Sequence, residues 1–158
     1  MSTVAVTRLI EAPVMRVWRV FTDLPARATW LSTVDAIEVM TPGLFGTGTV
    51  WRETRTMPGD VQVTEEFTVQ RCEEPTRFVV ASPGIGVDYR MTYTLTPVEV
   101  GRHRGGTAVT VVQEGAPSAP RGRLLVLVFG GLAARTVEGA LRRDLTDLAS
   151  AAVRPAAA

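Results

Sequence analysis

Two stretches of the sequence, residues 61–71 and 89–97, alternate apolar with polar residues over most of their length. Successive side chains of a β-strand point to opposite sides of its sheet, so this alternation predicts strands with one apolar and one polar face. The polar faces are rich in threonine, which favours an antiparallel sheet with water on one side. Another layer of the protein must therefore cover the apolar side. Similar patterns between proline- and glycine-containing turns predict further strands at 4–10, 34–40, 49–57, 78–82 and 107–114.

The C-terminal segment supplies that second layer. Apolar residues recur there mostly at intervals of three and four, which is the spacing of one face of an α-helix. They are Leu125, Val128, Phe129, Leu132, Val137, Leu141, Leu145 and Leu148. We expect one long helix that ends near Val153, followed by a disordered tail at 154–158. The pair Gly130-Gly131 either bends or breaks this helix, or leaves room for a ligand beneath it.

Two short helices are expected between the first strand and the rest of the sheet. Pro13 suits the first turn of a helix, because its missing N–H has no partner to lose there. The apolar residues that follow at helical spacing are Val14, Val17, Trp18 and Phe21. A second short helix at 26–31 would turn Trp30 and Leu31 inward. The chain is therefore predicted to be an α+β protein, with a single domain over residues 1–153.

Charge and hydropathy narrow the classes of partner. The net charge is +1 and the arginines are spread along the chain, so no nucleic-acid partner is expected. The longest apolar run, 124–134, is shorter than the about 20 residues that a membrane span needs. No signal sequence is evident at the start, which favours a cytoplasmic location. The run at 124–132 could contribute to a homodimer contact, although packing in the core explains it equally well.

Five segments, taken in order, resemble one known superfamily. They are VTRLIEAPVMRVWRVFTD, ATWL, GLFGTGTVWR, EEPTRFVVAS and MTYTLTPVEVGRHRGGTAVTVVQEG. Together they resemble the SRPBCC superfamily, which includes START-like lipid-transfer domains and the polyketide cyclase/dehydrase families, over roughly residues 3–153. The resemblance implies a helix-grip fold, in which a curved antiparallel sheet of about seven strands wraps around the C-terminal helix. Members bind lipids, hormones or polyketides, and some are enzymes, so the resemblance does not settle function.

Several kinds of chemistry are excluded by the residues that the chain lacks. His103 is the only histidine, which rules out a two-histidine metal site, and nothing places it near a nucleophile. The glycines at 43, 46 and 48 do not match a phosphate-binding loop or a dinucleotide fingerprint. We therefore expect neither a metal site nor a bound cofactor.

Charged residues on apolar strand faces are the positive functional signal. Glu65 shares a face with Phe67. Glu53 and Arg55 share a face with Trp51, but the opposite face of that strand is also partly apolar, so its orientation stays open. If these three charged residues face inward, they form a cluster in an apolar cavity, where burial would shift the pKa of a carboxylate. The alternative is an internal Glu–Arg pair, or a solvated group at the rim of the sheet.

Two sets of candidate site residues follow. Those that could move protons are Glu65, Glu53 and Tyr93. Those that could contact a ligand are Trp30, Trp51, Arg55, Phe67, Tyr89, Met91, Gln113, Val128 and Leu132. The favoured function is binding of a hydrophobic small molecule of lipid-, polyketide- or aromatic-like character between the sheet and the C-terminal helix. The alternatives are a polyketide cyclase/dehydratase-type enzyme and a protein-interaction module.

Overall fold

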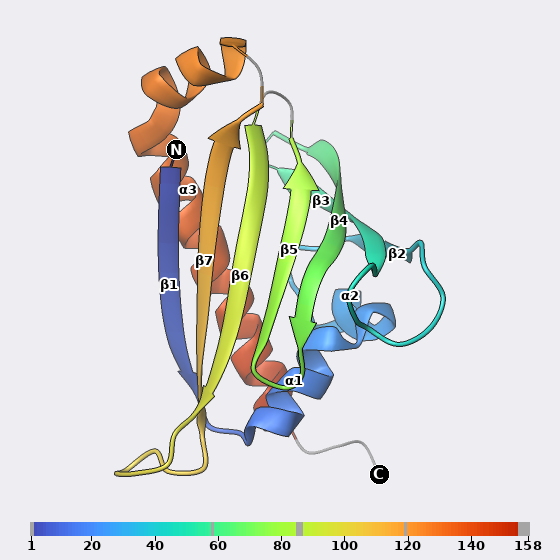
Figure 1. Ribbon diagram of the computed structural model, residues 1–158, viewed down its shortest axis with the longest axis vertical. Helices are drawn as coiled ribbons and strands as arrows, with labels where there is room; N and C mark the ends of the chain where they lie inside the picture. Colours follow the sequence, from blue (N-terminus) through green and yellow to red (C-terminus); the bar gives the residue numbers. More distant parts are fainter. Residues whose placement is uncertain (1, 58, 85–86, 119, 155–158) are drawn as a thin grey trace.

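One antiparallel sheet and one long helix make up most of the protein (Figure 1). The computed structural model describes the backbone at 2–57, 59–84, 87–118 and 120–154, and the side chains at these positions except 57 and 120–135. The elements are β1 (Ser2–Ile10), α1 (Val14–Thr22), η1 (Leu24–Ala26), α2 (Arg27–Trp30), β2 (Ala36–Val39), β3 (Val50–Met57), β4 (Val61–Glu73), β5 (Arg77–Pro83), β6 (Val87–Pro97), β7 (Thr107–Pro117) and α3 (Pro120–Val153). The predicted α+β helix-grip fold is confirmed.

The seven strands lie in the order β1-β7-β6-β5-β4-β3-β2, and every neighbouring pair is antiparallel. All seven expected strands are present, although each differs from its expected bounds by one to three residues at one end or at both. The strand β4 runs two residues further than expected, to Glu73, through a shift of register between Val69 and Arg71. Such a bulge bends its strand and increases the local twist, which helps the sheet to curve.

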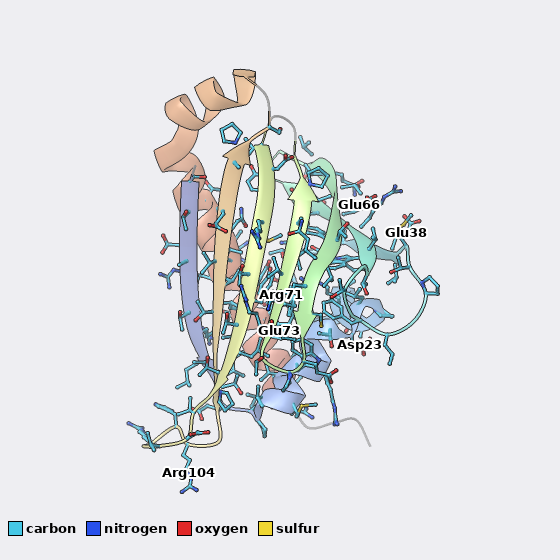
Figure 2. The ribbon with its side chains drawn as sticks, viewed as in Figure 1. Asp23, Glu38, Glu66, Arg71, Glu73 and Arg104 are labelled. Carbon is cyan, nitrogen blue, oxygen red and sulfur yellow. The ribbon has the colours of Figure 1, made fainter. Side chains whose placement is uncertain are left out.

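The core lies between one face of the sheet and the helices. Helix α1 buries Val17, Trp18 and Phe21, as the apolar stripe predicted. Helix α3 buries Leu141, Leu145 and Leu148 against the same face, and Figure 1 shows it running diagonally behind the strands. Polar side chains, among them Arg71 and Glu73, lie over the opposite face, which α3 leaves uncovered (Figure 2).

The long helix is continuous from Pro120 to Val153, so the break considered at Gly130-Gly131 does not occur. Its first turns are bent away from the axis of the rest (Figure 1). At the other end, Arg154 N–H donates to Ser150 O, and the remaining expected tail, 155–158, lies outside the described residues. Within the described part of the chain, no helix is long and apolar enough to cross a bilayer.

Candidate functional site

A pocket of about 610 Å³ lies between the inner face of the sheet and the middle turns of α3, residues 136–144. Its apolar wall consists of aromatic rings and several aliphatic side chains. Among these residues are Phe21, Phe45, Trp51, Phe67, Phe78, Val80 and Met91. Polar side chains enter the same space from β3, β4, β5, β6, β7 and α3, and so the pocket is apolar with a limited number of groups that could orient a ligand.

The orientation of β3, which the sequence left open, is settled by burial. Trp51 and Glu53 are only 2% and 1% exposed, whereas Arg52 between them is exposed on the outer face. The register pairs Trp51 with Phe67 and Glu53 with Glu65, so the inward face of β3 continues across β4. The charged residues of both strands therefore face the pocket, as the first of the two interpretations required.

Glu53 is the centre of a buried ionic network. Its Oε1 accepts hydrogen bonds from Arg27 Nε at 2.7 Å and from Trp51 Nε1 at 3.0 Å. Its Oε2 accepts one from Arg55 Nη2 at 3.0 Å. Arg27 is buried in its turn, with its guanidinium carbon 5.4 Å from the ring centroid of Phe21. The internal Glu–Arg pair considered as an alternative is thus present, and it lies within the pocket wall.

Arg55 extends this network to the long helix. Its Nη2 donates to Asp144 Oδ2 at 3.1 Å, and its Nη1 donates to Thr33 Oγ1 at 2.7 Å. Asp144 Oδ1 also accepts from Thr33 Oγ1 at 2.8 Å. These bonds join β3, α3 and the segment after α2, and they hold Asp144 of α3 against the inner face of β3.

The network keeps both of its central groups ionised. Burial alone would raise the pKa of Glu53, but the charges of Arg27 and Arg55, helped by hydrogen bonds from Trp51 and Arg55, hold it below its ordinary value. For Arg55, burial favours the neutral form, and the carboxylates of Asp144 and Glu53 outweigh it and raise the pKa. Glu53 is therefore a permanent acceptor whose oxygens already have partners.

Glu65 and Tyr93 differ from Glu53 in their surroundings. Glu65 makes no hydrogen bond or ion pair with any residue that the structure describes, and solvent reaches its side chain in the empty pocket. Partial burial raises its pKa; Arg55 opposes this, and the negative charge of Glu53 adds to it. Burial is also the main reason why the pKa of Tyr93 is raised to about 12. Tyr93 is consequently a neutral donor at physiological pH, and Glu65 is the carboxylate with free oxygens.

Most of the predicted site residues come together in this pocket. They are Glu53, Glu65, Tyr93, Trp51, Arg55, Phe67, Tyr89, Met91 and Gln113. Trp30 lines a small hollow next to it instead, and its buried Nε1 has no hydrogen-bond partner among the described residues. Val128 and Leu132 fall among the side chains outside the described part of the chain. The functional roles of all these residues stay predictions.

Sequence reasoning missed Arg27 and Asp144. Asp144 had a local signal, because it lies three residues after Leu141 and four before Leu148, at the edge of the apolar stripe. Arg27 had none, since its partner Glu53 is 26 residues away in the chain. His103 lies on the surface beside Glu11, as expected for a solvated loop residue. No group of three or more potential metal ligands occurs among the residues described.

Comparisons with known proteins agree with this geometry. The family model described as polyketide cyclase/dehydrase and lipid transport matches residues 1–153. A search of curated proteins by sequence found no significant match. Among solved structures, the protein TTHA0849 from Thermus thermophilus is 23% identical, with 96% of this chain and 97% of that chain covered and a TM-score of 0.72.

Two further similar structures are proteins of small-molecule biosynthesis by their names. A truncated norcoclaurine synthase from Thalictrum flavum is 15% identical, with 98% of this chain and 95% of that chain covered and a TM-score of 0.73. The di-domain ARO/CYC protein BexL from the BE-7585A biosynthetic pathway is 17% identical, with 97% of this chain but 51% of that chain covered and a TM-score of 0.68. At these identities the likeness shows the fold alone.

Proposed function

We propose that this chain, which belongs to the polyketide cyclase/dehydrase and lipid transport family, binds one apolar small molecule between the sheet and α3. The family match and the shared fold confirm the resemblance to the SRPBCC superfamily. Residues 1–153 would act as a single ligand-binding domain. The observation that carries the proposal is the pocket itself, which opens between the two layers and is walled in part by the aromatic rings of Phe21, Phe45, Trp51, Phe67 and Phe78.

The size and lining of the pocket support this function. Its volume of about 610 Å³ lies within the about 300–1,000 Å³ that small-molecule sites usually have. Burial of apolar ligand surface would contribute about 25 cal/mol for each Å² removed from water. Ring faces such as those of Trp51 and Phe67, whose centroids are 5.3 Å apart, favour flat or extended apolar molecules. The ligand class is therefore lipid-, polyketide- or aromatic-like.

A titration with the neutral dye N-phenyl-1-naphthylamine tests the proposal. We expect its fluorescence to rise and to saturate at one dye molecule for each chain. Ser82→Trp would place an indole in the pocket and weaken dye binding by about tenfold or more, because ligand and side chain compete for one volume. Ala81→Trp, one residue away on the outer face of β5, is the matched control and should bind like the wild type. Absence of saturable binding, or equal loss in both variants, would contradict the proposal.

The free carboxyl of Glu65 favours a second candidate function, that of a polyketide cyclase/dehydratase-type enzyme. A raised pKa and free oxygens suit a group that accepts and returns a proton. Glu53 suits this role less well, because three donors already occupy its oxygens. Tyr93 would act as a neutral hydrogen-bond donor to a ligand oxygen.

Turnover of a poly-β-ketoacyl thioester separates the enzyme from the binding protein. If Glu65 moves the proton, Glu65→Gln should lower the rate by about a hundredfold or more, since general acid–base catalysis contributes about 10²–10⁴-fold. Glu66→Gln changes the neighbouring residue, which pairs with Arg52 on the outer face, and should leave the rate unchanged. Wild-type rates in both Glu65→Gln and Tyr93→Phe would exclude catalysis through these two residues.

A further inference from the structure

The charged residues that line the pocket are mostly neutralised by one another. Arg27, Glu53, Arg55 and Asp144 bring two positive and two negative charges, and every one of them is engaged in the ion pairs described above. Both terminal nitrogens of Arg55 already donate to protein oxygens. A ligand carboxylate would thus have to displace Glu53 or Asp144 to reach this guanidinium. The buried network is therefore a poor receptor for an anion.

Glu65 is a charged residue of the pocket that takes no part in these ion pairs. It stands directly across from Glu53 in the β3–β4 register, and like charges in that position repel each other. Its side chain lines the pocket, and no described residue forms an ion pair or a hydrogen bond with it, although the more distant charge of Arg55 lowers its pKa in part. Partial burial raises the pKa of its carboxyl, because the charged form lacks full compensation. A carboxylate in this state gains more from a new positive partner than a fully solvated one does.

We propose that the bound molecule is an apolar amine, and that its ammonium group donates hydrogen bonds to the carboxylate of Glu65 while its hydrocarbon part lies against the aromatic wall. This inference rests on the proposed binding function and names the ligand class. The amine would complete the charge balance at the β3–β4 wall, since it adds one positive charge beside the one unpaired carboxylate there. Tyr89 remains available for a second polar group on the ligand, and Tyr93 could turn its hydroxyl to that group from its weak acceptor, Met91 Sδ, at 3.6 Å.

Arg143 is the group that could favour the opposite charge. It also lines the pocket from α3, and it makes no ion pair with a described residue. Its side chain is exposed, so that water solvates its charge and an anion gains little by binding there. Glu65 is also exposed in the empty pocket, but it shares the inner face of the β3–β4 pair with Trp51 and Phe67, where a bound molecule would exclude water from it. The amine is therefore the better match.

Three probes with the same naphthalene ring and similar size test the ligand class at pH 7: 1-naphthylmethylamine, 1-naphthylmethanol and 1-naphthoate. We expect the amine to bind the wild type about tenfold more tightly than the alcohol or better, because a hydrogen bond between charged groups is about twice as strong as a neutral one. The carboxylate should bind most weakly. Glu65→Gln should abolish the difference between amine and alcohol, and Glu66→Gln, which changes the outward neighbour, should preserve it.

The outcomes separate this inference from the function on which it rests. Equal binding of the three probes, or tightest binding of the carboxylate, would contradict the proposal that the ligand is an amine. Either result would still support binding of an apolar molecule in the pocket. Loss of carboxylate binding in Arg143→Gln would then identify that guanidinium as the selecting group. If neither these probes nor N-phenyl-1-naphthylamine bind, both proposals are wrong. The preference of the wild type is measured without any substitution, so a variant that folds poorly does not obscure the result.

Discussion

Replacement of Glu53 by glutamine is expected to lower the free energy of unfolding by about 3–5 kcal/mol, the usual cost of removing one partner from a buried ion pair. The carboxylate is 1% exposed and accepts hydrogen bonds from Arg27, Arg55 and Trp51. Without it, Arg55 keeps Asp144, whereas the buried Arg27 loses its only ion-pair partner among the described residues. Urea unfolding followed by circular dichroism measures the difference.

Glu66→Gln is the matched control for this prediction. Glu66 follows Glu65 in the chain but lies on the outer face of β4, where its carboxylate pairs with Arg52 at 3.0 Å. Glu66 is labelled in Figure 2. Both side chains of this pair are well exposed, with values of 44% and 43%, so the control should cost no more than about 1 kcal/mol. A loss at Glu53 as small as the loss at Glu66 would mean that Arg27 finds water or another acceptor, and the buried network would not hold α2 to β3.

The difference between the wild type and Glu53→Gln should also depend on pH. The pKa of Glu53 is lower in the folded protein than its ordinary value of 4.5, so ionised Glu53 stabilises the fold above that value. The contribution is lost as the pH falls through the lowered pKa, where the protonated carboxyl resembles an amide. The two proteins should therefore differ most near neutral pH, begin to converge in stability as the pH falls below about 4.5, and meet only below the lowered pKa of Glu53. A gap that persists unchanged into acid would point to packing rather than charge.

Truncation of Phe78 to alanine is expected to cost about 3–5 kcal/mol in the free energy of unfolding. Phe78 is 1% exposed, and its ring lies 4.8–5.6 Å from four other rings, measured between centroids. These rings belong to Trp18, Phe21, Phe45 and Tyr93. They come from α1, the β2–β3 connection and β6, so this one side chain joins three parts of the structure that border the pocket.

Two comparisons separate the causes of that loss. Phe78→Leu keeps most of the buried volume but removes the ring contacts, and it should cost less than the alanine variant. Leu44→Ala removes a side chain that is 97% exposed and should change the stability by no more than about 0.5 kcal/mol. If Phe78→Ala is as mild as Leu44→Ala, the aromatic wall is not a packed unit, and its shape in the absence of ligand would be undefined.

The fold was readable from the sequence because its main signals are local. Alternation in 61–71 and 89–97 depends only on the geometry of a strand, and the leucines at 141, 145 and 148 depend only on that of a helix. The packing of the C-terminal helix on the sheet then follows, because each of these two layers must bury its apolar side. The continuity of α3 through Gly130-Gly131 was not readable, because a helix that packs on a sheet tolerates a local cost of about 1 kcal/mol for each glycine.

The site was only partly readable, because its key contacts join residues far apart in the chain. Glu53, Arg55 and Glu65 could be named as a possible cluster from their strand faces. Which residues of β3 point inward could not be predicted, because the neighbouring residues Val50 and Trp51 are both apolar and lie on opposite faces. Which carboxylate is satisfied and which is free depends on Arg27 and Asp144, which reach β3 from α2 and α3. The sequence therefore named the chemistry but not the pairing that leaves Glu65 available.

Selective ¹³C labelling of the methionine methyl groups shows directly whether an apolar molecule enters between the sheet and α3. Met91 lines the pocket, whereas Met15 on α1 and Met40 after β2 are exposed and do not line it. On addition of N-phenyl-1-naphthylamine, the Met91 methyl resonance should shift and show contacts to the dye, while those of Met15 and Met40 stay in place. A shift at Met15 or Met40 with none at Met91 would place the dye on the surface and contradict a ligand-binding pocket.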